Sequence, residues 1–211
     1  MALVDPILVV VLLLNLFALG NSRIPSVIRI VGFQGALLGV LPLLVEHAGL
    51  RPVLLSIATI LLKGFVIPWM LLRAMREAQI RREMEPMIGY LPSMILVALA
   101  TGLSAMFARQ LPLAKEHVGS LLVPASLSTV LAGFIMVTTR FKAISQVVGY
   151  LMLENGIFIF GMLLVEAMPF LVEIGILLDL FVGIFVISII VHHINAAFSS
   201  LDTRKLSSLK E

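Results

Sequence analysis

Seven long apolar segments dominate this chain, and they restrict its possible folds more than any other feature. A helix needs roughly 20 apolar residues to cross the hydrocarbon core of a bilayer. The segments lie at about Leu3–Gly20, Ile24–Val45, Pro52–Leu72, Gly89–Ala108, Leu121–Thr139, Ile144–Val165 and Phe170–Val191. We therefore predict an all-α fold, a polytopic transmembrane helical bundle of about seven helices.

The composition excludes several other classes of protein. Of the 211 residues, 60% are hydrophobic and only 13% are charged, whereas a soluble domain is about half apolar and about a quarter charged. A water-soluble globule, a disordered chain and a nucleic-acid-binding protein are excluded on this ground. The chain has no cysteine, which removes disulfides, thiolate-bound iron–sulfur clusters and cysteine-type zinc sites.

The connections between the segments carry the charges that indicate orientation. When the connections alternate between the two sides, eleven of the 15 Lys and Arg residues fall on the side of the C-terminus. The opposite side receives Arg51, Arg109 and Lys115, and Lys63 lies within a segment. Basic residues are in excess on the cytoplasmic side of membrane proteins. We therefore predict an N-terminus outside and a C-terminus in the cytoplasm, and the charge bias also supports an odd number of helices.

Two prolines and a pair of glycines predict local features of the second and third segments. Pro42 and Pro68 lie inside these segments, and we expect a kink at each because proline interrupts helical hydrogen bonding. Gly35 and Gly39 have the spacing by which small residues let membrane helices approach each other closely. We interpret Gln34, beside them, as a packing residue.

Three ionisable residues occupy positions where a bilayer holds no water. Lys63, Glu154 and Asp179 each lie about ten residues into the third, sixth and seventh segments. At a rise of about 1.5 Å per residue, each is close to 15 Å from its helix end, near the middle of the bilayer. Each such residue costs at least about 2.5–3.5 kcal/mol on an insertion scale, so a compensating interaction or a function must account for it.

Two interpretations of these residues are open from the sequence. In the structural one, Lys63 forms a buried salt bridge with Glu154 or Asp179 and holds helices together. In the functional one, the lysine and the two carboxyls form a proton relay, because desolvated groups of both kinds exchange protons. Asn155 and Glu173 are secondary candidates. Asn155 follows Glu154 and can hydrogen-bond across helices, and Glu173 sits near the outer end of the last segment.

We predict no catalytic centre, cofactor or metal site within this chain. His47 and His117 fall in connections between segments, and His192 and His193 lie at the end of the last segment. A membrane haem needs histidines inside facing spans, and adjacent histidines point to different faces of a helix.

Three blocks of sequence resemble a known family. They are Gly149–Gly156, which reads GYLMLENG, Pro169–Asp179, which reads PFLVEIGILLD, and the polar tail Ser200–Lys210. Together they resemble hydrogenase-4 component E, a membrane subunit of formate hydrogenlyase-type and related group 4 nickel–iron hydrogenase complexes. The resemblance implies a membrane-arm subunit of a complex I-related hydrogenase in the cytoplasmic membrane of a prokaryote. Its function would be proton translocation coupled to electron transfer on other subunits.

The same resemblance implies partners and cofactors. The expected partners are large antiporter-like membrane subunits, a quinone-site-like membrane subunit and soluble hydrogenase subunits, besides the lipid bilayer. The nickel–iron site and the iron–sulfur clusters are expected on these partner subunits. Nucleic acid is not an expected partner.

The last three segments are also similar to the K-type subunit of respiratory complex I and to the C-type subunit of multi-subunit cation/proton antiporters. Glu154 matches the glutamate of the second helix in that family, and Asp179 matches the third-helix position, with aspartate in place of glutamate. Lys63 carries no role over from it. The implied organisation is a four-helix region at 1–110, a three-helix unit at 120–198 and a cytoplasmic tail at 199–211.

Three alternatives to the hydrogenase interpretation are retained. The chain is then a subunit of a multi-subunit cation/proton antiporter, a structural scaffold whose buried charges are ion-paired, or a stand-alone secondary transporter. The last is disfavoured by the odd helix count and by the absence of an inverted repeat in the sequence.

Overall fold

The computed structural model describes residues 3–45, 49–77, 84, 86–111 and 119–163. These residues form helices joined by short connections, and no named strand occurs among them. The elements in chain order are α1 (Val4–Gly20), α2 (Ile24–Leu38), α3 (Leu41–Val45), α4 (Leu50–Thr59), the π-helical segment η1 (Ile60–Val66), α5 (Ile67–Glu77), α6 (Tyr90–Ala108), α7 (Leu122–Thr139) and α8 (Ala143–Gly161). The all-α prediction is therefore confirmed for the described part of the chain.

In the described part of the chain, five helices are long and apolar enough to cross a membrane, which indicates a membrane-embedded protein. They are Ile24–Val45, Pro52–Arg76, Tyr90–Ala108, Leu122–Thr139 and Ala143–Gly161. A sixth apolar helix, α1, is shorter, with 17 residues. These six helices coincide with the first six predicted segments, and the seventh, Phe170–Val191, lies outside the described residues.

Regular α-helix is interrupted next to both of the prolines that we expected to disturb it. Before Pro42, α2 ends at Leu38 and α3 begins at Leu41. Before Pro68, the third span changes to the π-helical segment η1. There the backbone N–H of Ile67 donates to the carbonyl of Leu62, five residues back. Proline has no N–H to continue the ordinary ladder, so the interruptions fall where this chemistry requires them.

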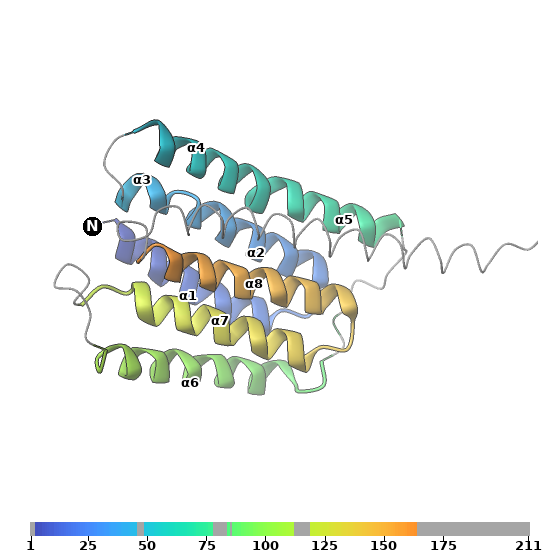
Figure 1. The fold of residues 1–211 in the computed structure, drawn as a ribbon. Helices are drawn as coiled ribbons and strands as arrows, with labels where there is room; N and C mark the ends of the chain where they lie inside the picture. The colour runs from blue at the N-terminus through green and yellow to red at the C-terminus, as the bar shows by residue number, and fades with distance from the viewer. Residues whose placement is uncertain (1–2, 46–48, 78–83, 85, 112–118, 164–211) are drawn as a thin grey trace, which may run out of the picture.

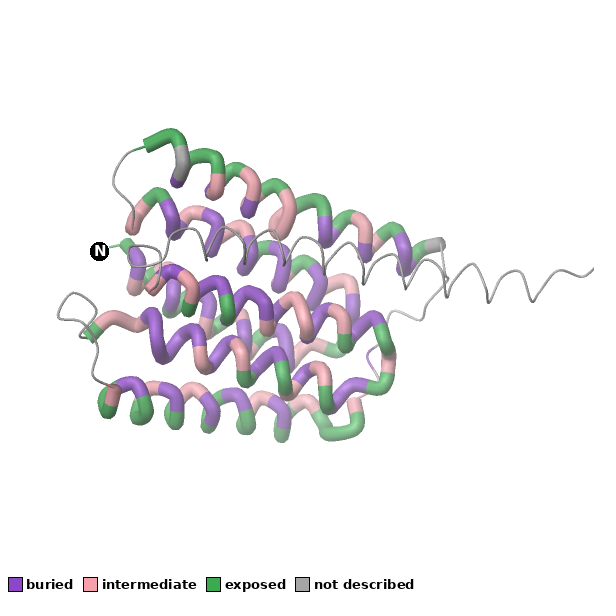
Figure 2. Tube along the Cα trace, viewed as in Figure 1, coloured by how far each residue is buried: buried purple, intermediate pink, exposed green. Residues whose placement is uncertain are grey.

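The helices run side by side in one bundle (Figure 1). A ring of four helices forms its centre, because α1 packs on α2 and α7, and α8 packs on the same two helices. The α6 helix lies along one edge against α1 and α7, and α4, η1 and α5 lie along the opposite edge against α2 (Figure 1). Buried residues concentrate on the central helices, and exposed residues follow the outer faces of the two edges (Figure 2).

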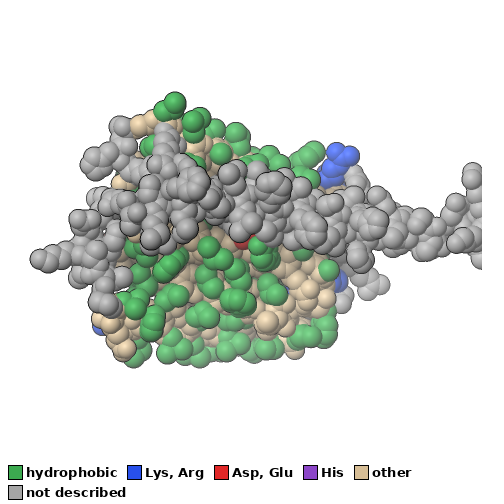
Figure 3. All heavy atoms as spheres, viewed as in Figure 1, with side chains coloured by type: hydrophobic (Ala, Val, Ile, Leu, Met, Phe, Trp, Pro, Cys, Tyr) green, Lys and Arg blue, Asp and Glu red, His purple; other side chains and the backbone are tan. Residues whose placement is uncertain are grey.

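The outer surface of the bundle is largely apolar, as expected for helices that face lipid. Where Figure 3 shows described residues, many of the side chains on this face are hydrophobic, and the visible Lys and Arg side chains lie toward its ends. On α6, Leu91 and Leu103 are more than 60% exposed, and on the opposite edge Phe65 and Trp69 are at least 60% exposed. Isolated large apolar side chains on a soluble protein are normal, but continuous apolar edges are typical of a membrane span.

Glycines allow the closest helix contacts in the bundle. A Cβ atom added to Gly35 of α2 would lie 2.8 Å from the Cβ of Lys63 in η1. Between α7 and α8, a Cβ added to Gly133 would lie 2.6 Å from the backbone nitrogen of Leu153. The predicted close approach at Gly35 is therefore confirmed, and the α7–α8 pair is packed backbone against backbone.

Two apolar clusters fill the interior at opposite ends of the bundle. The first, near the end of α1 and the start of α2, includes Leu19, Ile28, Val31, Met136, Val148 and Met152. The second, toward the start of α1, includes Leu8, Val11, Leu38, Leu122, Phe158 and Ile159. Each central helix contributes to both clusters, and the residues that separate them are polar.

Candidate functional site

A polar layer lies between the two apolar clusters at mid-depth in the bundle. It consists of Asn15 on α1, Gln34 on α2, Thr129 on α7 and Asn155 on α8, and all four side chains are buried. On each helix the polar residue stands between residues of the first cluster and residues of the second. One buried polar group from each central helix therefore reaches the same level.

These four side chains form a continuous chain of hydrogen bonds across the bundle. Asn155 Nδ2 donates to Gln34 Oε1 at 3.2 Å, and Gln34 Nε2 donates to Asn15 Oδ1 at 2.8 Å. Asn15 Nδ2 in turn donates to Thr129 Oγ1 at 2.9 Å. Asn155 Nδ2 also lies 3.4 Å from the carbonyl of Val31. Because buried amides without partners are costly, these hydrogen bonds favour one arrangement of the four helices.

A second hydrogen bond extends the polar layer to α6. The hydroxyl oxygens of Thr101 and Ser128 are 2.6 Å apart. Thr101 Oγ1 also donates to the carbonyl of Val97 at 2.8 Å, which uses its single proton. Ser128 is therefore the donor of the shared bond, and five helices contribute polar side chains at this depth.

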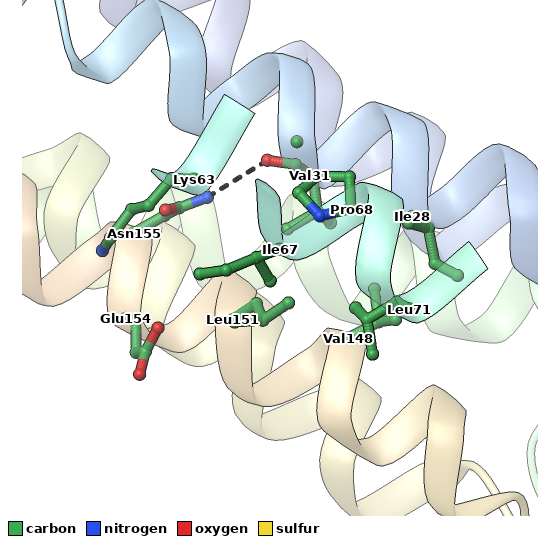
Figure 4. A pocket seen from close by; sticks show the side chains of 11 residues that line it. Ile28, Val31, Lys63, Ile67, Pro68, Leu71, Val148, Leu151, Glu154 and Asn155 are labelled. Atoms are coloured by element: carbon green, nitrogen blue, oxygen red, sulfur yellow. Dashed lines mark hydrogen bonds between the residues drawn. The ribbon is translucent and has the colours of Figure 1, made fainter. Parts of the chain in front are cut away.

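A small cavity lies on the other side of Asn155, between α2, α8 and the η1–α5 segment (Figure 4). Lys63, Glu154 and Asn155 line it together with apolar side chains such as Ile67 and Leu151. The cavity volume, measured as the space that the centre of a water molecule can reach, is about 10 Å³. This is room for about one water. Most of the lining is apolar, and Lys63, Glu154 and Asn155 are its polar residues.

The side chains of the three polar residues that line this cavity point in different directions. The amide of Asn155 points toward the carbonyl of Val31, and the Glu154 carboxyl leaves α8 in another direction (Figure 4). The ammonium of Lys63 lies 5.4 Å from the centroid of the Phe158 ring, which is cation–π distance. Glu154 is only 1% exposed. Lys63 and Glu154 thus line one small cavity at mid-depth in the bundle, and the Glu154 carboxyl is directed away from the Asn155 amide (Figure 4).

The structure brings together part of the predicted site. Lys63, Glu154 and Asn155, predicted from their depth in separate segments, line the same cavity. Asp179 and Glu173 lie outside the described residues, so their places in the relay stay predictions. Gln34 is more than the packing residue that we expected, because it bonds to both Asn15 and Asn155.

Sequence reasoning missed Asn15 and Thr129. The signal was present, since Asn15 is a lone polar residue in the middle of an apolar segment and Thr129 follows Ser126 and Ser128 in the middle of another. Polar side chains inside membrane helices usually face other helices and find partners there. Their rotational positions, which decide the partners, are not readable from segment lengths.

Arg140 is a further buried polar residue that the sequence did not single out. It follows the last residue of α7 and is fully buried. Its guanidinium donates to the carbonyl of Leu19 at 3.1 Å, to the carbonyl of Ile88 at 3.3 Å and to Ser93 Oγ at 3.4 Å. Leu19 belongs to the last turn of α1, whose carbonyls lack partners within the helix. Arg140 therefore joins the end of α1 to the start of α6 and the end of α7.

The electrostatics of Arg140 are consistent with this anchoring role. Burial lowers the pKa of the Arg140 guanidinium, and the interaction with Tyr90, whose ring centroid is 5.5 Å away, opposes that change. An arginine stays protonated under all ordinary conditions because its normal pKa is far above neutrality. Arg140 is thus a fixed positive charge that holds helix ends, rather than a group that exchanges protons.

Within the described part of the chain, no three His, Asp or Glu side chains come close enough to hold a metal ion. Among the described residues, the polar groups at mid-depth are hydroxyls, amides, the Lys63 amine and the Glu154 carboxyl. Their chemistry suits hydrogen bonding, water binding and proton exchange.

Fold and site together define a helical membrane protein whose bundle encloses a polar layer and a small charged cavity. The uncharacterized protein Rv0085 of Mycobacterium tuberculosis is 34% identical to this chain over 194 residues, which cover 88% of this chain and 86% of that protein. The chain belongs to the same family as Rv0085. No family model matches the sequence, and no solved structure matches it.

Proposed function

We propose that this protein is a membrane-arm subunit of a complex I-related hydrogenase complex of the hydrogenase-4 kind, and that it moves protons at mid-depth in the bilayer. The observation that carries the proposal is the cavity that Lys63 and Glu154 share. Two ionisable residues inside membrane helices are expensive and are usually functional. The resemblance of the Gly149–Gly156 block to hydrogenase-4 component E supports the same conclusion.

The proposed proton route runs through Lys63, water and Glu154. A carboxyl and an amine can each bind and release a proton, and water can bridge two such groups. The amide chain from Asn155 to Thr129 gives up its protons far less readily, so its role is to hold Asn155 and α8 in place. Asp179 is the proposed second carboxyl of the relay.

We also propose seven membrane helices, an outer N-terminus and a cytoplasmic C-terminus in the cytoplasmic membrane of a prokaryote. Exposed Arg23, Arg73 and Arg76 lie at the end of the bundle where α1 and α5 finish. The Arg73 guanidinium is 5.6 Å from the centroid of the Trp69 ring, and Trp and Arg mark membrane interfaces. Reporter fusions at each terminus test the orientation, and a C-terminal fusion that is active only outside the cytoplasm contradicts it.

The proposed complex supplies the redox chemistry. Large antiporter-like membrane subunits, a quinone-site-like membrane subunit and soluble hydrogenase subunits are the proposed partners. The nickel–iron site and iron–sulfur clusters belong to those partners, because this chain has no cysteine to bind a cluster. Co-purification tests this part, and a stable protein that purifies alone from its native membrane contradicts it.

Glu154→Gln is the experiment that tests the proton role. The substitution keeps the size and hydrogen bonding of the side chain but removes its exchangeable carboxyl. We expect a normal amount of intact complex in the membrane and a fall of roughly 10²-fold in proton movement per turnover in vesicles. Glu154→Asp is the matched control and should be milder. An assembled Glu154→Gln complex with unchanged proton movement contradicts the proposal.

A structural scaffold is the second candidate, and a specific observation favours it. The amides of the polar layer are bonded to one another, as expected for groups that hold helices together. If Glu154 served only to hold helices together as the ion-pair partner of Lys63, its loss would leave the charge of Lys63 buried without that partner, at a cost of about 3–5 kcal/mol. Glu154→Gln would then remove the complex from the membrane instead of uncoupling it. An antiporter subunit would show the first result with partners other than hydrogenase subunits.

A further inference from the structure

Two hydroxyl groups on α4 lack hydrogen-bond partners. Ser56 and Thr59 are 1% and 2% exposed, and neither Ser56 Oγ nor Thr59 Oγ1 has a hydrogen bond. Helical Ser and Thr usually donate to the carbonyl one turn earlier. Elsewhere in this molecule Thr101, Ser104 and Thr138 do so. Buried polar groups almost always have a partner, and a water molecule is the usual one when the protein offers none.

The two hydroxyls and Lys63 lie on the same face of the helix. Ser56, Thr59 and Lys63 are three and four residues apart, the spacing of neighbours on one side of a helix. From the start of α4, Ser56 lies at about 9 Å, Thr59 at about 14 Å and Lys63 at about 20 Å along the helix axis. The stripe therefore begins about 9 Å inside the helix and ends at Lys63, which lines the cavity at mid-depth.

The backbone changes where this stripe meets the cavity. Thr59 is the last residue of α4, and Lys63 is the central residue of the π-helical segment η1. A π-helical turn is rare and is frequently found at functional sites. In membrane helices, backbone groups released from the ordinary ladder are often satisfied by ordered water.

We propose that Ser56 and Thr59 bind a short file of water molecules, which connects Lys63 with the membrane face at which α4 begins. Each hydroxyl offers one donor and two acceptors, enough for a water on either side. Under the proposed orientation this is the outer face, and the file is the outer half of the proton route. The water file itself follows from the unpartnered hydroxyls, and only its role as a proton path rests on the proposed function.

Single cysteines test the file directly, because the chain has no cysteine of its own. Ser56→Cys and Thr59→Cys are made in the full chain in native membrane vesicles of known sidedness. A charged, membrane-impermeant methanethiosulfonate reagent with a trimethylammonium group is added at the face where α4 begins. Ile57→Cys is the matched control, since Ile57 lies between the two hydroxyls at the same depth and is 51% exposed on the apolar surface.

The reagent attacks the hydrated thiolate, so a cysteine in a water file reacts and one in an apolar environment does not. We expect Ser56→Cys and Thr59→Cys to react at least about tenfold faster than Ile57→Cys. Each rate is normalised to the reaction after denaturation in detergent. Rates equal to or below that of Ile57→Cys overturn the water file, as does faster reaction from the opposite face.

The inference and the proposed function fail in different ways. If the cysteines react as expected but Glu154→Gln leaves proton movement unchanged, the file exists and the proton role is wrong. If Glu154→Gln stops proton movement but the cysteines are inert, the proton role holds and the file is wrong. Thr59→Val, which removes only the hydroxyl, joins the two: with the file in use, proton movement falls severalfold while the amount of complex stays normal.

Discussion

The α7–α8 pair and the α4–η1–α5 span differ in nearly every respect that matters for movement. In the most apolar 18-residue stretch of each span, 61% of the residues of α7 and 56% of those of α8 are buried, against 22% in the α4–η1–α5 span. The pair is regular α-helix throughout, whereas the other span contains a π-helical segment. The pair meets through glycines such as Gly156, and the other span carries Ser56, Thr59 and Lys63. The α7–α8 pair is therefore a rigid frame that positions Glu154. The α4–η1–α5 span is an adaptable span, and it carries Ser56, Thr59 and Lys63.

The largest expected effect is on the frame. Gly156→Ala would place a Cβ 2.6 Å from the backbone nitrogen of Val130, so the two helices must separate. Overpacking of this kind costs about 1–3 kcal/mol or more. We expect a clear loss of thermal stability in detergent and less protein in the membrane.

Gly102→Ala is the matched control for that substitution. Gly102 is also inside a helix, but nothing lies within 4 Å of an added Cβ. Alanine is the better helix former by about 1 kcal/mol, so this variant should be as stable as the wild type or more stable. Equal behaviour of the two variants would show that the α7–α8 contact is not the rigid element.

The second effect is functional and concerns the adaptable span. Lys63→Met should lower coupled proton movement by roughly 10²-fold, because it removes the amine on which the proposed proton route depends. Lys63→Arg keeps the positive charge and should be milder. Proton movement per turnover in vesicles measures both, beside the amount of assembled complex. If both variants assemble and work like the wild type, Lys63 is neither a relay group nor an essential counter-ion.

A smaller effect is expected in the polar layer. Gln34→Met is close in volume but leaves Asn15 Oδ1 without its donor and leaves Asn155 Nδ2 with only the carbonyl of Val31 as acceptor. An unsatisfied buried group costs about 1–3 kcal/mol. Thermal unfolding in detergent measures the loss. A Gln34→Met protein as stable as the wild type would mean that these amides contribute nothing to the frame.

The smallest effect on stability is expected at Thr59. Thr59→Val preserves the shape of the side chain, and the hydroxyl has no protein partner to lose. Replacing such a group by an apolar one of equal shape is nearly neutral, within about 0.5 kcal/mol. Thermal unfolding of this variant should match the wild type, in contrast to Gln34→Met. A large loss at Thr59 would place the hydroxyl in the frame rather than in the adaptable span.

The sequence predicted the helices and the depth of the charged groups well, for physical reasons. Apolar length alone marks a span, so six predicted segments match helices. Residue number within a span gives depth, which is why Lys63 and Glu154 were expected at one level and line one cavity. Pro42 and Pro68 marked the interruptions because a missing N–H acts locally.

What the sequence did not predict depends on helix rotation and on partners far along the chain. The bond between Asn15 and Thr129 joins residues 114 positions apart. Arg140 was counted simply as a basic loop residue, but its guanidinium reaches Leu19, which is 121 positions away. Neither bond leaves a local pattern. The unpartnered hydroxyls of Ser56 and Thr59 are equally invisible, since the same residue types bond to their own helix elsewhere.

The polar layer has a consequence for how the bundle is assembled. Membrane helices insert one at a time and then associate, and an apolar helix can slide along its neighbour at little cost because lipid and side chains are alike. Here a slip of one turn, about 5.4 Å, would carry the amide of Asn15 or Gln34 into an apolar cluster. Only one vertical alignment lets all four central helices bond. The polar layer thus fixes the vertical alignment of the helices during assembly, and with it the depth of Glu154 in the membrane.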